Sequence, residues 1–185
     1  MATAIDRKGY GQVEPNHLSA QKTGQIYAQL PAAYVDDGTV KPIAQLEQGQ
    51  FLKYNYANNR ASLDGDGEWM LVYCEEKLYD ERRQNHKDFC LYAKDFTDGY
   101  IYPRLLKTNI GDIYTTNTFG GHASDPDANV VGVSLDAGNY LEVDASTGFL
   151  KVAANLAGAS VPCFQVAKVY TMPDGQPGVK LVRVK

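Results

Sequence analysis

The feature that most constrains the fold is a succession of short β-forming runs, each bounded by turn residues. Apolar and polar residues alternate in FLKYNYA (51–57), and β-branched and aromatic residues fill NVVGVSL (129–135) and VPCFQVAKVY (161–170). Clusters of glycine, aspartate and proline, such as DGDG at 64–67, separate such runs. The one fair helix candidate, residues 75–88, lacks an apolar stripe, so we expect it to be short or irregular. Many short strands with almost no amphipathic helix predict an all-β fold, either a compact antiparallel β-barrel or a sandwich.

A glycine introduces several of these runs. LEQGQFLKYNYA (46–57) and LDAGNYLEVDAS (135–146) align when Gly49 is placed on Gly138, and a looser third copy contains Gly111. A chain that enters a strand from a tight turn often needs a positive φ, which glycine adopts without a Cβ clash. We therefore interpret these glycines as structural turns.

The C-terminal part of the chain gives the clearest local signal. Pro173 and Asp174 suit the middle of a type I turn, and Gly175 follows them. The β-forming runs on either side predict a C-terminal hairpin.

Residues 1–42 differ from the rest of the chain. Glycines and prolines are scattered through them, and no period of two or 3.6 is sustained. The segment is nevertheless too apolar for a free tail. We predict an extended N-terminal arm (1–42) ahead of a β-barrel or sandwich domain (43–185), with the arm lying along the surface of its own domain or of a partner. The predicted partner-binding residues of the arm are Ile26, Tyr27, Leu30 and Tyr34.

Composition excludes several classes of function. The net charge is −4, so a broad positive field that attracts nucleic acid is not expected. No apolar run approaches the roughly 20 residues that cross a bilayer. Cys74, Cys90 and Cys163 lie in apolar runs and are interpreted as core residues of a protein made in a reducing compartment.

The sequence contains no recognisable catalytic, metal or cofactor site. The serine-nucleophile elbow, the phosphate-binding loop and the zinc-protease motif are all missing, and His17, His86 and His122 are scattered in polar sequence. We therefore predict a protein that is not an enzyme and that needs no cofactor or metal.

The 13 tyrosines suggest an alternative. Flat aromatic faces can stack on sugar rings, and Tyr92, Tyr100 and Tyr102 together with Trp69 are candidates for such a platform. Half-buried tyrosines are also ordinary residues of β-strands, because an aromatic side chain fits a pleated surface with one wet edge.

One phrase of the sequence resembles a known class of protein. LDAGNYLEVDASTGFLKVA (135–153) is similar to the turn–strand–turn–strand sequence pattern of the decoration, or cement, proteins of tailed bacteriophage heads. The N-terminal segment, with its scattered apolar residues, resembles the arms of these proteins. The matching positions are Gly138, Leu141, Val143, Asp144, Thr147, Gly148 and Leu150. All have structural rather than catalytic explanations.

The resemblance implies a non-enzymatic virion structural protein that binds the outside of an assembled capsid and stabilises it. The implied partners are the major capsid protein or other virion proteins, and the implied state is a homo-oligomer such as a trimer, assembled in the host cytoplasm and located in the virion. The alternative function is that of a carbohydrate-binding β-sandwich module of a virion or a secreted protein.

Overall fold

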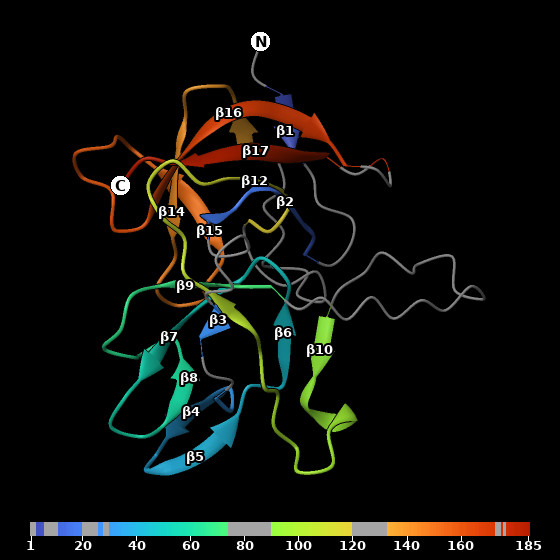
Figure 1. Cartoon of the computed structure of the whole chain (residues 1–185), viewed down its shortest axis with the longest axis vertical. Helices are drawn as coiled ribbons and strands as arrows, with labels where there is room; N and C mark the ends of the chain where they lie inside the picture. Colours follow the sequence, from blue (N-terminus) through green and yellow to red (C-terminus); the bar gives the residue numbers. More distant parts are fainter. Residues whose placement is uncertain are drawn as a thin grey trace.

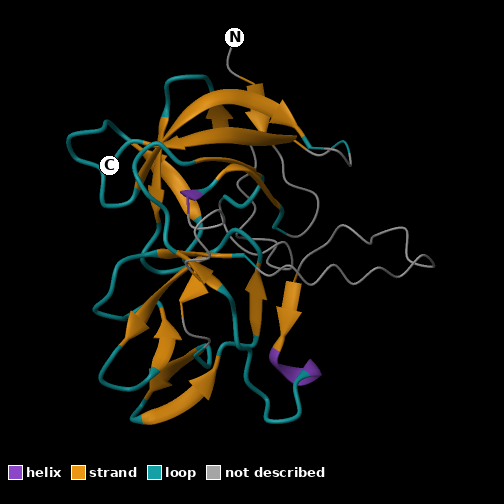
Figure 2. Cartoon of the chain, viewed as in Figure 1, coloured by secondary structure: helices purple, strands orange, loops and turns teal. Residues whose placement is uncertain are grey.

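The computed structural model describes residues 3–5, 11–19, 26–27, 30–73, 90–119, 133–172, 175 and 177–185. Strands dominate these residues, and helical backbone among them is confined to Ser19 and the short 3-10 helix η1 (Ala93–Asp95) (Figure 2). The predicted all-β fold is confirmed, and its open antiparallel sheets form a sandwich-like arrangement rather than a closed barrel. The helix candidate at 75–88, as well as Cys74, His86 and His122, lies outside the described residues.

The larger sheet has six strands and forms the upper part of the molecule (Figure 1). In spatial order its strands are β15 (Leu150–Ala153), β14 (Tyr140–Val143), β16 (Cys163–Thr171), β17 (Pro177–Arg183), β12 (Ile113–Thr116) and β2 (Val13–His17). The long hairpin formed by β16 and β17 confirms the predicted C-terminal hairpin.

A five-stranded sheet lies below it (Figure 1). Its strands, in order, are β3 (Ile26–Tyr27), β11 (Leu105–Leu106), β9 (Met70–Val72), β7 (Phe51–Asn55) and β8 (Arg60–Ser62). Three two-stranded pairs complete the described fold: β1 (Thr3–Ile5) with β13 (Val133–Leu135), β6 (Gln45–Glu47) with β10 (Cys90–Tyr92), and β4 (Ala33–Asp36) with β5 (Thr39–Pro42).

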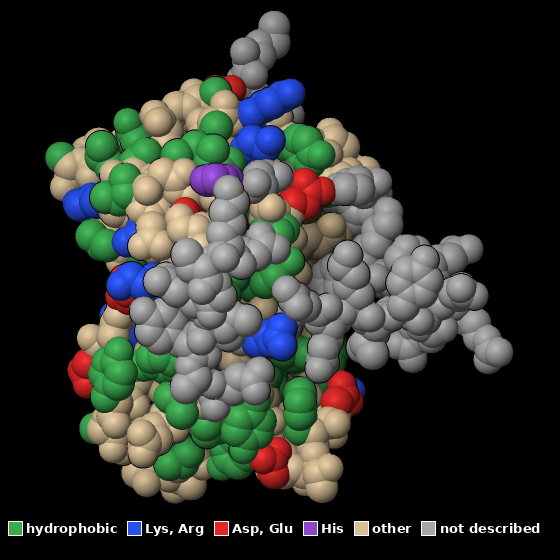
Figure 3. Space-filling model, viewed as in Figure 1, with side chains coloured by type: hydrophobic (Ala, Val, Ile, Leu, Met, Phe, Trp, Pro, Cys, Tyr) green, Lys and Arg blue, Asp and Glu red, His purple; other side chains and the backbone are tan. Residues whose placement is uncertain are grey.

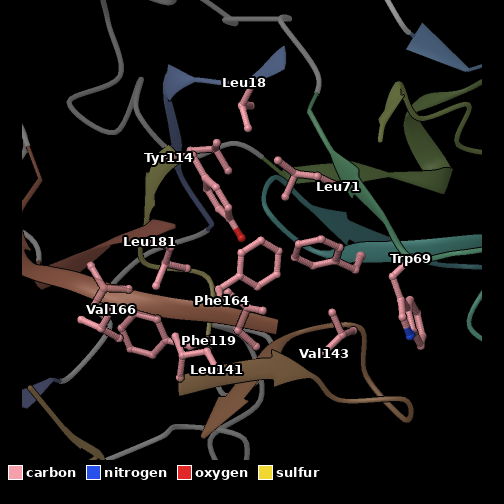
Figure 4. Close-up of a cluster of buried hydrophobic side chains, with 14 of the residues drawn as sticks. Leu18, Trp69, Leu71, Tyr114, Phe119, Leu141, Val143, Phe164, Val166 and Leu181 are labelled. Atoms are coloured by element: carbon pink, nitrogen blue, oxygen red, sulfur yellow. The ribbon is translucent and has the colours of Figure 1, made fainter. Parts of the chain in front are cut away.

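The five-stranded sheet is buried on both faces. Alternate residues of a strand point to opposite faces, so Phe51 and Leu71 reach the six-stranded sheet while Leu52 and Met70 point the other way. We call the first cluster the upper core; Figure 4 shows part of it. The second, which includes Leu46, Leu52, Met70 and Leu105, is the lower core. This double burial explains why the run around residues 69–72 is continuously apolar rather than alternating.

Aromatic rings occupy the centre of the upper core (Figure 4). The rings of Phe51 and Phe164 lie 5.7 Å apart between centroids, and Tyr114 packs edge-on against Phe164 at 5.4 Å. These contacts join β7 of one sheet to β12 and β16 of the other. Such aromatic pairs contribute about 0.5–1.5 kcal/mol each beyond their burial.

The glycines that introduce strands share one turn, used three times. Each turn has four residues, with the glycine third. The N–H of the fourth residue donates to the carbonyl of the first, and the side-chain oxygen of the fourth residue accepts from the N–H of the first. The glycine donates its N–H to a carbonyl of the adjoining strand, and the fourth residue accepts from the same strand residue. The turns are Glu47–Gln50, Asn109–Asp112 and Asp136–Asn139, with glycine φ values of 88°, 90° and 95° for Gly49, Gly111 and Gly138. The near-repetition in the sequence is therefore a repeated structural element.

The remaining two predicted turn glycines also have positive φ, 75° at Gly148 and 85° at Gly175. A Cβ at Gly148 would lie 2.3 Å from the carbonyl oxygen of Phe51, so this position also needs glycine for a close backbone approach.

The N-terminal segment is not a separate arm where the structure describes it. Strand β2 is an edge of the six-stranded sheet and pairs with β12, and Val13 and Leu18 belong to the upper core. Strand β3 pairs with β11, and β1 pairs with β13. The predicted boundary after residue 42 also separates no units, because the N–H of Ile43 donates to the carbonyl of Ala32. Val13, Leu18 and Ala32 thus pack within the chain's own domain, which is one of the two places that the sequence allows for this segment.

Buried polar groups fix the segment in place. The carboxylate of Glu47 accepts from the N–H of Gly11 at 2.7 Å, and the side-chain oxygen of Asn117 accepts from the N–H of Gln12 at 2.7 Å. The hydroxyl of Thr116 donates to the carbonyl of Gln12 at 2.6 Å. Because buried backbone groups are costly without partners, these side chains hold the entry of β2 against the body.

Candidate protein-binding surface

Strands β4 and β5 form a hairpin that extends from the lower end of the molecule (Figure 1). Its turn is Asp37-Gly38, and both residues have positive φ, 46° and 72°. This is the geometry of a type I′ turn, whose twist matches that of paired strands and which favours Asp-Gly. The local sequence therefore specifies the hairpin.

Apolar side chains of this hairpin are exposed. Tyr34 and Val35 are each 43% exposed, and Val40 is 49% exposed. Val35 lies directly opposite Val40, while Tyr34 pairs with Lys41 and therefore lies on the other face. We call Tyr34, Val35 and Val40 the hairpin surface. Hydrophobic side chains gather over the same end of the molecule in Figure 3.

The base of the hairpin is fixed to the body. Ala32 is fully buried and donates its N–H to the carbonyl of Ile101 at 2.8 Å, while its own carbonyl accepts from Ile43. The N–H of Ala61 donates to the carbonyl of Pro31 at 3.0 Å. Toward the tip, Lys41 and Asp36 form an exposed ion pair at 2.5 Å, and pairs of this kind contribute little to stability.

The structure separates the four predicted partner-binding residues. Tyr34 lies on the hairpin surface, whereas Leu30 is half-buried and packs against the lower core. Ile26 and Tyr27 form β3, whose backbone extends the five-stranded sheet; their side chains lie outside the described part of the structure. Sequence reasoning missed Val35 and Val40, although the Asp-Gly pair between them is a hairpin signal.

Three buried ionisable groups, Asp112, Arg183 and Glu47, form hydrogen bonds with backbone groups. Asp112 accepts from the N–H of Ser19 at 3.0 Å and from the N–H of Asn109 at 2.8 Å. Arg183 donates to the carbonyl and hydroxyl of Thr108, and its burial lowers the pKa of its guanidinium. Together with the hydrogen bond from the Gly11 N–H to the Glu47 carboxylate, these contacts hold strands and turns together.

The described residues contain no cluster of three or more groups that could hold a metal ion. Burial, with the neighbouring Glu47, raises the pKa of Cys90 to about 12, and burial also raises the pKa of Cys163. Neither thiol is thus activated as a nucleophile. His17 is exposed on β2.

Of the four aromatic residues considered for sugar binding, Tyr92, Tyr100, Tyr102 and Trp69, burial excludes Trp69 from an open platform. Trp69 is buried in the upper core, with the Lys53 ammonium 4.6 Å from its ring centroid. Lys94 lies over the ring of Tyr92, and the exposed Tyr102 donates its hydroxyl to Asp98 at 2.7 Å. That hydrogen bond lowers the pKa of Asp98 and raises the pKa of Tyr102.

No protein-family model, curated protein or solved structure matches this chain. Within the described ranges, no helix is long and apolar enough to span a membrane.

Proposed function

We propose that this protein is a non-enzymatic structural protein of a virion that binds the outside of an assembled phage capsid and stabilises it. Its partner in this proposal is the major capsid protein, and the contact is made through the hairpin surface. The observation that supports the proposal most is the exposure of Tyr34, Val35 and Val40 on a hairpin whose base is fixed to a rigid body.

The energetics of the hairpin favour protein binding. Its strands are already paired, so a partner need not order this backbone, a step that costs about 1–2 kcal/mol per residue for a flexible segment. Its exposed tyrosine belongs to a residue type that is enriched at protein interfaces. A pre-formed hairpin with apolar side chains on both faces can insert between subunits of a shell.

The sequence phrase that resembles decoration proteins supports the same proposal. Residues 135–153 form the end of β13, the Gly138 turn and the hairpin of β14 and β15. In the loop of that hairpin, Asp144 accepts from the N–H and the hydroxyl of Ser146, and this bonding lowers the pKa of Asp144. The matched residues thus build a stiff hairpin, which suits a structural role. A homo-oligomer, as the resemblance implies, would multiply the hairpin contacts with a symmetric shell.

The test is co-sedimentation with purified capsids of the virus that encodes the chain. Val40→Asp and Val35→Asp place a charge on the hairpin surface and should reduce binding at least about tenfold, because a carboxylate would be desolvated in an apolar contact. Val152→Asp is the matched control, since Val152 is also 49% exposed and also lies on a strand, β15. It should bind as the wild type does.

Equal co-sedimentation of the wild type and the two hairpin variants would refute the assignment of this surface. Failure of the wild type to bind any capsid component, together with specific binding on a glycan array, would instead favour the carbohydrate-binding alternative. Circular dichroism of each variant verifies that the fold is retained.

A further inference from the structure

Two lysines, the exposed Lys168 and the half-buried Lys180, lie next to each other on the C-terminal hairpin. The register of β16 and β17 shifts between Val166 and Lys168, so Ala167 is an extra residue and Lys168 lies directly opposite Lys180. Bulges of this kind re-aim side chains. The phenolic ring of Tyr170, two residues further along the same face, lies 5.9 Å from the Lys180 ammonium.

These two lysines differ from the other lysines in the described part of the chain. The others have close partners: Lys41 with Asp36, Lys107 with Glu68, Lys151 with Glu142 and Asp144, Lys53 over Trp69, Lys94 over Tyr92, and Lys185 with the carbonyls of Ala157 and Ala159. Among the described residues, Lys168 has no hydrogen bond, ion pair or ring contact, and Lys180 has the ring of Tyr170 alone.

No carboxylate lies beside the pair within the described sheet. Across the sheet, Lys180 of β17 pairs with Thr115 of β12, and Thr115 pairs with Glu14 of β2. Strand β12 therefore separates the Glu14 carboxylate from Lys180. Two strand spacings correspond to about 10 Å, roughly one screening length at physiological salt. Like charges directly opposite on a sheet are unfavourable, so an incoming carboxylate would relieve a repulsion as well as add an attraction.

We propose that Lys168, Lys180 and Tyr170 form a second docking surface, the lysine face, and that its partner is an acidic protein surface carrying exposed carboxylates. Charge complementarity supports this occupant. A nucleic acid fits less well, because its binding depends on an extended positive field, and this chain carries a net charge of −4. Figure 3 shows basic side chains, with a few acidic ones near them, over the end of the molecule where Figure 1 places β16 and β17, opposite the hairpin surface.

The test is a titration of the full-length protein with an oligoglutamate peptide, followed through backbone amide chemical shifts. The expected result is shifts centred on residues 167–170 and Lys180, present at about 0.05 M NaCl and much weaker at about 0.5 M. The double variant Lys168→Gln with Lys180→Gln should bind about fivefold more weakly. Lys151→Gln removes a lysine from the same sheet and should bind as the wild type does.

A DNA duplex of equal charge concentration forms the second arm of the experiment. Stronger shifts with DNA than with oligoglutamate at the lysine face would overturn the choice of an acidic protein. Shifts that are absent, that centre elsewhere, or that persist unchanged in the double variant would overturn the surface itself. Neither readout depends on capsid binding, so failure here is distinguishable from failure of the proposed function.

Discussion

Replacing Leu18 with alanine tests whether the N-terminal segment belongs to the domain core. Leu18 is 2% exposed and packs in the upper core just after β2. Buried Leu→Ala changes cost about 2–5 kcal/mol, because they remove apolar contacts and leave a cavity. We expect a loss of about 3 kcal/mol in the free energy of unfolding. An arm that binds only a partner would show almost no loss.

The protein offers a convenient probe for this measurement. Trp69 is the single tryptophan, and it is buried in the same core as Leu18. Urea unfolding followed by its fluorescence should show a lower midpoint with little change in the denaturant slope. In a thermal melt, a loss of about 3 kcal/mol lowers Tm by roughly 6–12 °C for a domain of this size.

Tyr34→Ala is the control, since Tyr34 also lies within the predicted arm but is exposed. It should change stability by no more than about 0.5 kcal/mol. Deletion of residues 1–19 should cost more than Leu18→Ala, because it also removes the pairing of β2 with β12. Leu18 would not belong to the core if Leu18→Ala changed the free energy of unfolding by less than about 0.5 kcal/mol, the size expected for a surface site. The truncated chain would then also keep the urea midpoint of the wild type.

Further changes test individual contacts. Tyr114→Phe should be neutral or stabilise the protein by up to about 1 kcal/mol in urea unfolding, because the buried hydroxyl has no hydrogen-bond partner among the described residues; a clear loss would contradict this. Glu47→Ala should lower the free energy of unfolding by at least about 2 kcal/mol and speed hydrogen exchange at the Gly11 amide, because that amide loses its acceptor. Unchanged protection of the Gly11 amide would contradict this. Gly49→Ala should destabilise more than Gly111→Ala in the same assay, because both have positive φ but only at Gly49 would a Cβ meet nearby atoms; equal losses would refute this.

The parts of the fold that follow from local chemistry were predictable from the sequence. Gly49 and Gly138 occupy equivalent positions in two similar stretches because a positive φ before a strand restricts the choice of residue, and the structure gives them the same turn. The C-terminal hairpin likewise needs only a short turn between two β-forming runs. Interactions of this kind lie within a few residues, so a short window contains the information.

The place of the N-terminal segment could not be derived in the same way. The contact between Gln12 and Asn117 joins residues 105 positions apart, and the pairing of β2 with β12 spans a similar distance. The local sequence of an apolar segment without periodicity does not distinguish packing on the chain's own core from packing on a partner protein. The hairpin surface is an intermediate case: its Asp37-Gly38 turn is a local signal, whereas the exposure of its side chains depends on what the rest of the chain leaves uncovered.

The positions of the two proposed surfaces give them a joint consequence. The hairpin surface and the lysine face lie at opposite ends of the long axis, with the stacked sheets and both cores between them (Figure 1). One contact would be apolar and insensitive to salt, and the other electrostatic and weakened by salt. Because a rigid body fixes the distance between its two ends, binding at one end raises the effective concentration of the other at a neighbouring subunit. Two individually weak contacts could then stabilise a shell only where its subunits present both partner surfaces at that spacing. Binding would therefore require the assembled particle, because free subunits do not hold the two partner surfaces at a fixed distance.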